Sequence, residues 1–279
     1  MGSLNQEEGM HSLHTERGDI PDTQFTHPER LIYADGTPKA VWMSWQGIQD
    51  LATFKLSTHL KSIRRVLIVA PHPDDEILGC AGLMQHIRAY DPKIDIIIIA
   101  VTNGTASHPH SRLYRAEQLN QVRPQETLTA LHVLQLDNIQ RIAVNIQDGE
   151  IQQSQSRLHD FLKQYISPHD LLISTYEKDG HPDHEYTAHV VKDIAHQFQL
   201  RHLQVLIWAW HWAQPNDPQI DWEHAYRLDL SHTDLEKKRQ AIDCFQSQIE
   251  PDPTTQAAAI LSANTIDRIL MPYEVYLHV

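Results

Sequence analysis

The chain has 279 residues and a formal net charge of -13, from 23 Lys and Arg against 36 Asp and Glu. An acidic protein repels phosphate backbones, so a nucleic-acid partner is not expected, and no run approaches the roughly 18 apolar residues that a membrane span needs. The two cysteines, Cys80 and Cys244, follow no CxxC spacing. They are expected to be free thiols of a cytoplasmic protein.

The beginning of the sequence differs in composition from the rest. Residues 1–54 start with a stretch rich in Gln, Glu, His, Pro and Gly, which predicts an arm that is partly disordered or packed on the domain. The first 17 residues are polar and charged and lack the apolar core of a secretory signal. Val41 to Phe54 is apolar enough to form a short packed helix. The remaining residues, 55–279, have a length that suits one large α/β domain.

Apolar runs alternate with helix-like segments through this domain. Strands are predicted at 66–70, 94–102, 139–144, 170–175, 203–210, 225–230 and 273–279. Helices are predicted at 78–90, 115–134, 151–165, 183–197, 233–248 and 255–270, and Pro124 is expected to kink the second of these or divide it. The β-branched run at 94–101 is typical of a parallel strand buried on both faces. The alternation predicts a single-domain α/β fold of the Rossmann-like three-layer α/β/α type, with a mostly parallel sheet.

Two turns rich in His and Asp each follow a predicted strand. The first is His72-Pro73-Asp74-Asp75-Glu76, after the strand at 66–70, and the second runs from Asp179 to His184, after the strand at 170–175. Ligands of open α/β sheets bind at the carboxyl ends of strands, so the turns can meet if their strands are neighbours. His and Asp suit zinc and similar ions, and a catalytic zinc site uses three protein ligands. The first turn offers His72 and Asp75, and the third ligand is expected from the second turn.

The two turns resemble the signatures of a known enzyme family. His-Pro-Asp-Asp-Glu at 72–76 and His-Pro-Asp-His at 181–184 look like the two motifs of the PIG-L/LmbE-like N-acetylglucosaminyl deacetylases. Those are metal-dependent enzymes that remove acyl groups, mostly acetyl, from the amine of amino sugars. Weaker matches follow in the same order, at Thr102-Asn103-Gly104, Arg123-x-x-Glu126, Lys238, Ala241 and Ser247-Gln248. The resemblance covers residues 65–279 and leaves the start of the chain outside.

This resemblance implies roles for the residues of both turns. His72, Asp75 and His184 would be the metal ligands, for zinc or for ferrous iron, since a set of two His and one Asp suits both. Asp74 would be the general base that accepts a proton from the attacking water. His181 would stabilise the oxyanion or protonate the leaving amine. The alternative for these residues is a turn or a helix-capping role.

Three further features have weaker assignments. Asp183 would orient a metal-binding histidine through a hydrogen bond, and a helix cap is the equal alternative. Arg123 would contact the substrate through paired hydrogen bonds, or would form a surface ion pair with Glu126 at helical spacing. Alternation along a strand would place Trp208, Trp210 and Trp212 on one face and His211 on the other. Core packing is a commoner reason for such tryptophans than stacking on a sugar.

The function predicted by the resemblance is hydrolysis of the acetamide of a small N-acetylated amino sugar or glycoconjugate, to free amine and acetate. One rival is an amidase of a thiol or sugar conjugate. The other is a non-catalytic carbohydrate-binding module, against which Asp74 argues, because a binding module needs no base. The sequence leaves open the substrate and whether the protein is a homo-oligomer. Specificity is expected in the loops at 104–114, 176–181 and 211–224.

Overall fold

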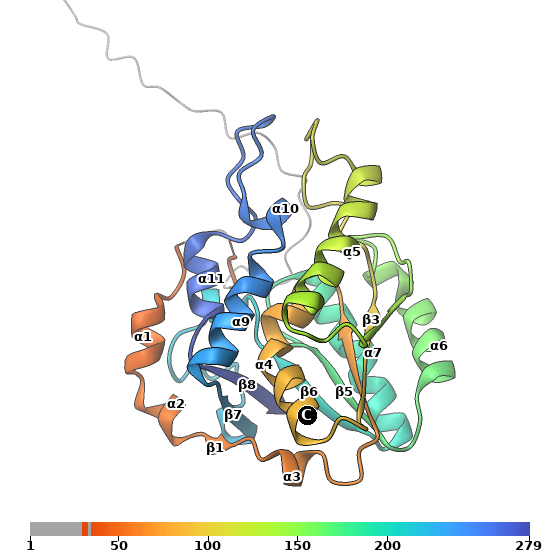
Figure 1. The fold of residues 1–279 in the computed structure, drawn as a ribbon, viewed down its shortest axis with the longest axis vertical. Coiled ribbons are helices and arrows are strands. Elements are labelled where there is room, and N and C mark those ends of the chain that lie inside the picture. The colour runs from red at the N-terminus through yellow and green to blue at the C-terminus, as the bar shows by residue number, and fades with distance from the viewer. Residues whose placement is uncertain (1–29, 33–34) are drawn as a thin grey trace, which may run out of the picture.

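A sheet of eight strands lies at the centre of the computed structural model, which describes residues 30–32 and 35–279 (Figure 1). In spatial order the strands are β1 (Ala52–Thr53), β7 (Ala225–Asp229), β8 (Tyr273–His278), β6 (Arg201–Val205), β5 (Asp170–Thr175), β2 (Arg65–Ala70), β3 (Asp95–Ala100) and β4 (Gln140–Ala143). Neighbouring strands are parallel, except that β8 lies antiparallel between β7 and β6. The predicted α/β class and the mostly parallel sheet are confirmed.

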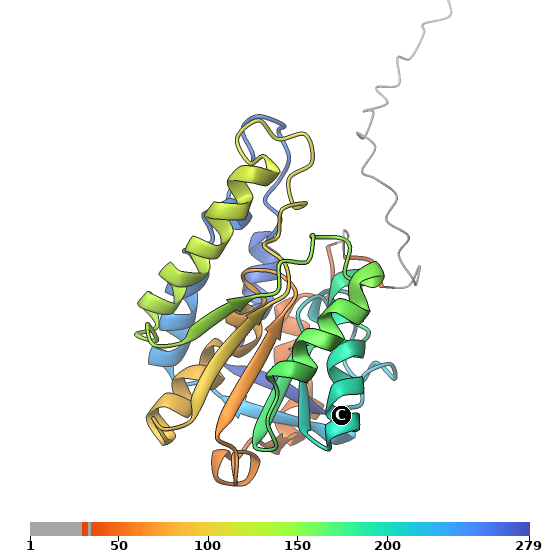
Figure 2. The same ribbon diagram turned by 90° about the vertical axis from the view of Figure 1, so that its right-hand side faces the viewer.

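Helices cover both faces of this sheet. They are α1 (Lys39–Ser44), α2 (Gln46–Asp50), α3 (Leu56–His59), α4 (Asp75–Tyr90), α5 (Ala116–Val133), α6 (Gln155–Tyr165), α7 (Pro182–Phe198), α8 (Ala209–Trp212), α9 (His232–Ile242), α10 (Gln246–Ile249) and α11 (Ala263–Ile269). Figure 2 shows the sheet edge-on, with α6 and α7 on one side and α5 on the other. The sheet is therefore the middle of three layers.

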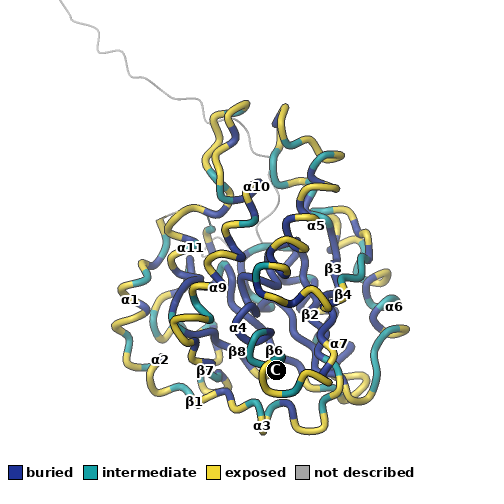
Figure 3. Tube along the Cα trace, viewed as in Figure 1, coloured by how far each residue is buried: buried dark blue, intermediate teal, exposed yellow. Residues whose placement is uncertain are grey.

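The central strands are buried on both faces, as the apolar runs predict. Along β2, Val66, Ile68 and Ala70 pack into one core cluster with α4. The alternate residues, Leu67 and Val69, pack into a second cluster with α6 and α7. Figure 3 shows this burial along the central strands, with the exposed residues concentrated in the surrounding loops and helix faces.

The part of the chain before residue 55 contributes to the sheet and to its edge. The predicted helix at Val41 to Phe54 is two short helices, α1 and α2, followed by β1, which pairs with β7. Trp42 on α1 is fully buried, and its indole N–H donates to the Trp210 carbonyl at 3.0 Å. Most of the predicted arm, residues 1–29, lies outside the described residues.

Three predicted elements differ from the structure. The segment 115–134 is one helix, α5, and not two pieces: Asn120, whose carbonyl loses its helical partner to Pro124, is exposed to water. The helix at 233–248 is divided into α9 and α10, because Phe245 turns into the core and the Ser247 N–H donates to Glu126 instead. The helix at 255–270 is only α11, because Ser262 caps its first turn by accepting the Thr265 N–H at 3.1 Å.

Two loops project beside each other from the carboxyl edge of the sheet (Figures 1 and 2). The first precedes α5, and the second follows α10. The Arg112 N–H donates to Thr254 Oγ1 at 3.0 Å, which ties the two loops together. Among the described residues, no helix combines the length and the apolar character that crossing a bilayer requires. Cys80 and Cys244 are free thiols, as predicted.

One buried histidine gives the folded state a pH dependence. His202 on β6 is 1% exposed, and its Nε2 lies 2.8 Å from Ser174 Oγ on β5. Burial, with a smaller effect of Lys192 and His278, lowers the pKa of His202 to about 3. The unfolded chain therefore binds a proton here below about pH 6.5 that the folded chain does not bind. Stability from this residue is present above that pH and is lost as the pH falls towards 3.

The His202→Gln variant should lose this part of the pH dependence. Between pH 6.5 and 5 the histidine is expected to cost the wild type about 2 kcal/mol of unfolding free energy. Urea unfolding at pH 7, 6 and 5 measures the slope, with His196→Gln as the control at an exposed position. Equal slopes in wild type and His202→Gln would show that another group is responsible.

Candidate metal and catalytic site

Two neighbouring parallel strands bring the predicted turns together. β2 and β5 pair in parallel, with Val69 opposite Ser174, so both strands end at the same edge of the sheet. The first turn leads from β2 into α4, which begins at Asp75, and the second leads from β5 into α7, which begins at Pro182. The amino ends of two helices therefore face one site. Their unpaired N–H groups and dipoles favour negative charge there.

Three side-chain atoms from the two turns form an equilateral triangle. His72 Nδ1, Asp75 Oδ2 and His184 Nε2 are each 3.3 Å from the other two. Ligands about 2.1 Å from a tetrahedral zinc ion would be about 3.4 Å apart. All three side chains are buried. The two imidazoles and the carboxylate thus fit a divalent ion in both donor chemistry and spacing.

Carboxylates hold the opposite ring nitrogens of these histidines. His72 Nε2 lies 3.2 Å from Asp148 Oδ1 and 3.4 Å from Asp183 Oδ2. His184 Nδ1 lies 2.7 Å from Asp179 Oδ2. A histidine that binds metal through one nitrogen usually donates the other N–H to such a partner, which fixes the ring and makes it a stronger ligand.

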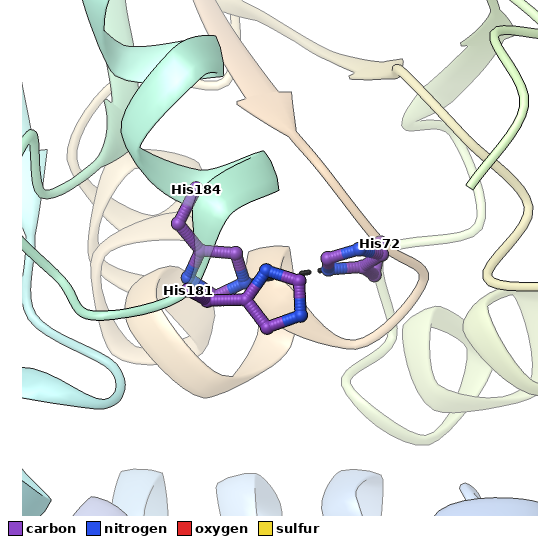
Figure 4. Close-up of side chains that lie close together, drawn as sticks. All are labelled: His72, His181 and His184. Atoms are coloured by element: carbon purple, nitrogen blue, oxygen red, sulfur yellow. Dashed lines mark hydrogen bonds between the residues drawn. The ribbon is translucent and has the colours of Figure 1, made fainter. Parts of the chain in front are cut away.

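Other groupings around His72 also bring metal-binding atoms together. One ligand atom from each of His72, His181 and His184 lies within 4.8 Å of the other two (Figure 4). The same holds for one ligand atom from each of His72, Asp148 and Asp183. Each residue there offers one ligand atom. The described part of the chain therefore holds a buried His and Asp group that could bind a metal ion.

The charges of the triangle stabilise one another. Burial is the largest single effect and opposes ionisation of both His184 and Asp75, but the charges and hydrogen bonds of their partners together outweigh it. The pKa of His184 rises to about 9, with further help from Asp179. The pKa of Asp75 falls well below its usual range, because both His184 and His72 favour its carboxylate.

Asp74 lies beside the triangle in a strained conformation. Its φ of +133° and ψ of −33° are outside the regions that residues other than glycine normally adopt. Such strain is concentrated at functional sites. The side chain is buried and accepts a hydrogen bond from Arg123 Nη2 at 2.9 Å. Burial raises the pKa of Asp74 to about 7, although Arg123 opposes the shift.

Arg123 on α5 is buried against the first turn and is held there by three hydrogen bonds. It is 3% exposed, and its guanidinium donates to the carbonyls of Gly104 and Pro73 at 3.0 and 2.8 Å, in addition to Asp74. The alternative prediction, a surface ion pair between Arg123 and Glu126, is wrong, because Arg123 is buried and Glu126 accepts a hydrogen bond from Ser247 Oγ at 2.7 Å. Gly104 has a φ of +63°, and an added Cβ would lie 1.9 Å from Arg123 Nη1. A substrate contact by Arg123 stays a prediction.

His181 faces the triangle from the start of α7. Its ring centroid is 4.8 Å from those of His72 and His184 (Figure 4). Among the described residues, its Nδ1 has no hydrogen-bond partner although the atom is buried. Burial, followed by the charges of His184 and His72, lowers the pKa of His181 to about 3. The ring is therefore a neutral group with hydrogen-bonding capacity left for another molecule.

Two of the carboxylates that hold the histidines are not assigned this role from the sequence: Asp148 is not singled out, and Asp179 is named only as the start of the second turn. Asp148 follows the end of β4, and Asp179 follows the end of β5, so both obey the strand-end rule that identified the two turns. Asp183 also accepts the Gly149 N–H at 2.8 Å, and this hydrogen bond links the start of α7 to the loop that follows β4. The strand-end signal could have identified both carboxylates, but not which histidine each one faces.

The tryptophan cluster is not part of a strand, so the predicted alternation is wrong. β6 ends at Val205 because the Asp179 carboxylate accepts the N–H groups of Ile207, Trp208 and Ala209 and turns the chain into α8. Trp210 packs in the core, 5.0 Å from Trp42 between ring centroids. This arrangement favours the core-packing alternative.

Comparison with known proteins gives one family and one curated relative. Residues 67–195 match the family described as PIG-L: GlcNAc-PI de-N-acetylase. The Probable N-acetyl-alpha-D-glucosaminyl L-malate deacetylase 2 of Bacillus subtilis (strain 168) is 28% identical over 131 residues, which are 45% of this chain and 58% of that protein. The match thus spans less than two thirds of that relative's length.

Two of the solved structures with a similar fold are named as deacetylases. A deacetylase of the teicoplanin biosynthesis pathway superposes with a TM-score of 0.57 at 14% identity, over 77% of this chain and 97% of that one. The N,N'-diacetylchitobiose deacetylase from Pyrococcus horikoshii superposes with a TM-score of 0.51 at 16% identity, over 74% and 77%. Identities this low show likeness of fold. Together with the match of residues 67–195 to the PIG-L family, which spans both turns, they agree with the resemblance seen in the sequence.

Proposed function

We propose that this protein is a metal-dependent N-deacetylase, which hydrolyses the acetamide of an N-acetylated amino sugar or glycoconjugate. The observation that carries the proposal is the triangle of His72 Nδ1, Asp75 Oδ2 and His184 Nε2, with 3.3 Å sides and a buried carboxylate, Asp74, next to it. The names of the Bacillus and Pyrococcus relatives, both deacetylases of N-acetylated sugars, support the same bond and substrate class.

His72, Asp75 and His184 would hold the ion, with zinc and ferrous iron as the two candidates. When bound, the ion would act as a Lewis acid that polarises the amide carbonyl and makes water more acidic. Asp148 and Asp179 would keep the two imidazoles in the orientation that presents one nitrogen of each to the ion.

Asp74 and His181 would move the protons. Asp74, held by Arg123, would accept a proton from the water that attacks the carbonyl carbon. His181 lies across the site, where its neutral ring would donate a hydrogen bond to the oxyanion. The C–N bond then breaks, the nitrogen leaves as an amine with the proton that Asp74 accepted from water, and the acyl group leaves as acetate.

The substrate is best tested with a panel of acetylated sugars. The metal-loaded protein is incubated with free N-acetylglucosamine, its glycosides, N,N'-diacetylchitobiose and a thiol-linked sugar amide, and the freed amine is quantified. We expect amine and acetate in equal amounts from at least one N-acetylated sugar. Release from the thiol conjugate alone would favour the amidase alternative. No release by a metal-loaded protein that still binds the sugars would favour the carbohydrate-binding alternative.

The composition and the two cysteines support a proposal for the compartment and the partner of this protein. We propose a cytoplasmic location, supported by the two free thiols, which a reducing compartment preserves. The partner would be a small sugar substrate, since a net charge of -13 disfavours nucleic acid.

A further inference from the structure

Arg30 reaches the second turn from outside the matched family region, residues 67–195. Its side chain is buried, and Nη1 donates to Glu185 Oε1 at 3.0 Å, while Nε donates to Gln219 Oε1 at 3.0 Å. The guanidinium carbon lies 5.7 Å from the centroid of the Trp212 ring. A buried guanidinium is tolerated only with such partners, so these contacts define one orientation for Arg30 and for the Glu185 that it pairs with.

Glu185 transmits this orientation to the backbone of the turn. The oxygen that accepts from Arg30, Oε1, also accepts the Gly180 N–H at 3.0 Å. Gly180 has a φ of +92°, and an added Cβ would lie 3.1 Å from the Arg30 carbonyl oxygen and 3.2 Å from Trp212 Cδ1. Trp212 in turn donates its indole N–H to the Asp179 carbonyl at 2.9 Å. The backbone at 179–180 is therefore enclosed by Arg30, Glu185 and Trp212.

The residue that follows this enclosed backbone is His181. Its imidazole has no hydrogen-bond partner at Nδ1 among the described residues, and it makes no capping bond to α7. Apart from its contacts with the rings of His72 and His184, the position of this ring depends on the backbone that carries it. His184 has its own supports, because Asp179 holds its ring at 2.7 Å and Thr175 Oγ1 donates to its carbonyl at 3.0 Å.

We propose that Arg30 is a positioning residue, which fixes Glu185 and the Gly180 N–H and thereby holds His181 where the proposed hydrolysis needs it. The inference rests on the proposed function for the role of His181. The inference means that a residue of the N-terminal segment, outside the matched residues 67–195, helps to position a catalytic group. A shift of about 1 Å in a catalytic group can cost about a hundredfold in rate.

The first test compares Arg30→Ala with wild type in the full chain loaded with metal. We expect kcat to fall about tenfold to a hundredfold, with KM and bound metal nearly unchanged, because the contacts of His184 remain. Arg30→Lys should recover part of kcat, since an ammonium can pair with Glu185 but cannot stack on Trp212 as a guanidinium does. Lys39→Ala is the matched control, because it removes an exposed ion pair of the same segment, to Asp267, on α11.

A second measurement reports on the turn without activity. Hydrogen exchange of the Gly180 amide should be faster in Arg30→Ala than in wild type or Lys39→Ala, because its acceptor, Glu185, has lost the hydrogen bond from Arg30. Wild-type kcat in Arg30→Ala, or an equal loss of kcat in Lys39→Ala, would overturn the inference. A variant with a lower melting temperature but unchanged kcat would also overturn it, since Arg30 would then be only structural.

These outcomes are distinct from a failure of the proposed function. If metal-loaded wild type releases no amine from any sugar, the proposed function fails, and the Gly180 exchange rates alone decide the effect of Arg30 on the turn. Faster exchange only in Arg30→Ala would support that effect, and equal exchange would overturn it.

Discussion

Replacing Asp74 with asparagine is expected to lower turnover by about a hundredfold to ten-thousandfold, the range that a general base contributes. The amide cannot accept the proton from water, but it keeps the shape of the side chain. Asparagine also tolerates positive φ better than most residues, so the strained backbone at +133° should persist. Steady-state kinetics gives the loss, and elemental analysis gives the bound metal, which should stay at the wild-type level.

The control for this variant is Asp91→Asn. Asp91 is the C-cap residue that follows α4, at the opposite end of the helix from Asp74, and within the described residues its side chain accepts the Lys93 N–H at 3.0 Å. Its kcat should equal that of wild type. Turnover by Asp74→Asn within a few-fold of wild type would remove Asp74 from the role of base. Loss of metal in that variant would assign it to metal binding instead.

The Lys238→Met variant is expected to have the largest effect on stability. Lys238 is 1% exposed, and its Nζ lies 2.8 Å from Glu274 Oε1. The same carboxylate accepts the N–H groups of Gly82 and Leu83 and the Tyr276 hydroxyl, at 2.7 to 2.9 Å. Removing the ammonium leaves a buried carboxylate with neutral donors alone. That should cost about 3 to 5 kcal/mol of unfolding free energy, which lowers the melting temperature by about 10 °C.

Two further variants separate the charge from the packing. Lys237→Met makes the same change one residue earlier, where within the described residues the lysine makes an exposed hydrogen bond to Gln135, and it should change stability by about 0.5 kcal/mol or less. The double variant Lys238→Met/Glu274→Gln should recover part of the loss, because neither charge is left alone. A cost below about 1 kcal/mol for Lys238→Met would contradict the account of a buried ion pair.

The central strands could be predicted because their signal is local. The strand predicted at 170–175 is β5, residue for residue, and the one at 66–70 is β2 without its first residue. Both are buried on two faces, and the consecutive apolar residues that this requires, Val66–Ala70 and Leu171–Ile173, can be read from the sequence. The position of β8 between β7 and β6 could not be predicted, because strand order depends on contacts between segments far apart in the chain.

The wrong boundaries have a common cause. At 207–209, the Asp179 carboxylate, which lies far away in the sequence, captures three N–H groups and ends the strand pattern. At 245–248, Glu126 does the same to the Ser247 N–H and divides a helix. Periodicity reports the local preference of the chain and carries no information about these distant acceptors.

The candidate site likewise has features that the local sequence predicts and features that depend on contacts between distant segments. The two turns, and their meeting at one edge of the sheet, follow from strand ends and a parallel pairing that sequence alone made plausible. The spacing of the three ligand atoms, the hydrogen bond from Arg123 to Asp74 and the reach of Arg30 to Glu185 follow from the packing. The strand ends predict which reacting groups meet. The packing decides which other residues hold those groups in place.

The most direct test of a metal-dependent deacetylase measures bound metal and freed amine in the same samples. The wild type is stripped with a chelator and zinc or ferrous iron is then restored in steps. Amine release should rise in proportion to the bound metal and reach its maximum at about one ion per chain. His184→Ala should neither retain the ion nor recover activity. Full amine release by the stripped wild type, or wild-type metal content in His184→Ala, would contradict the proposed site.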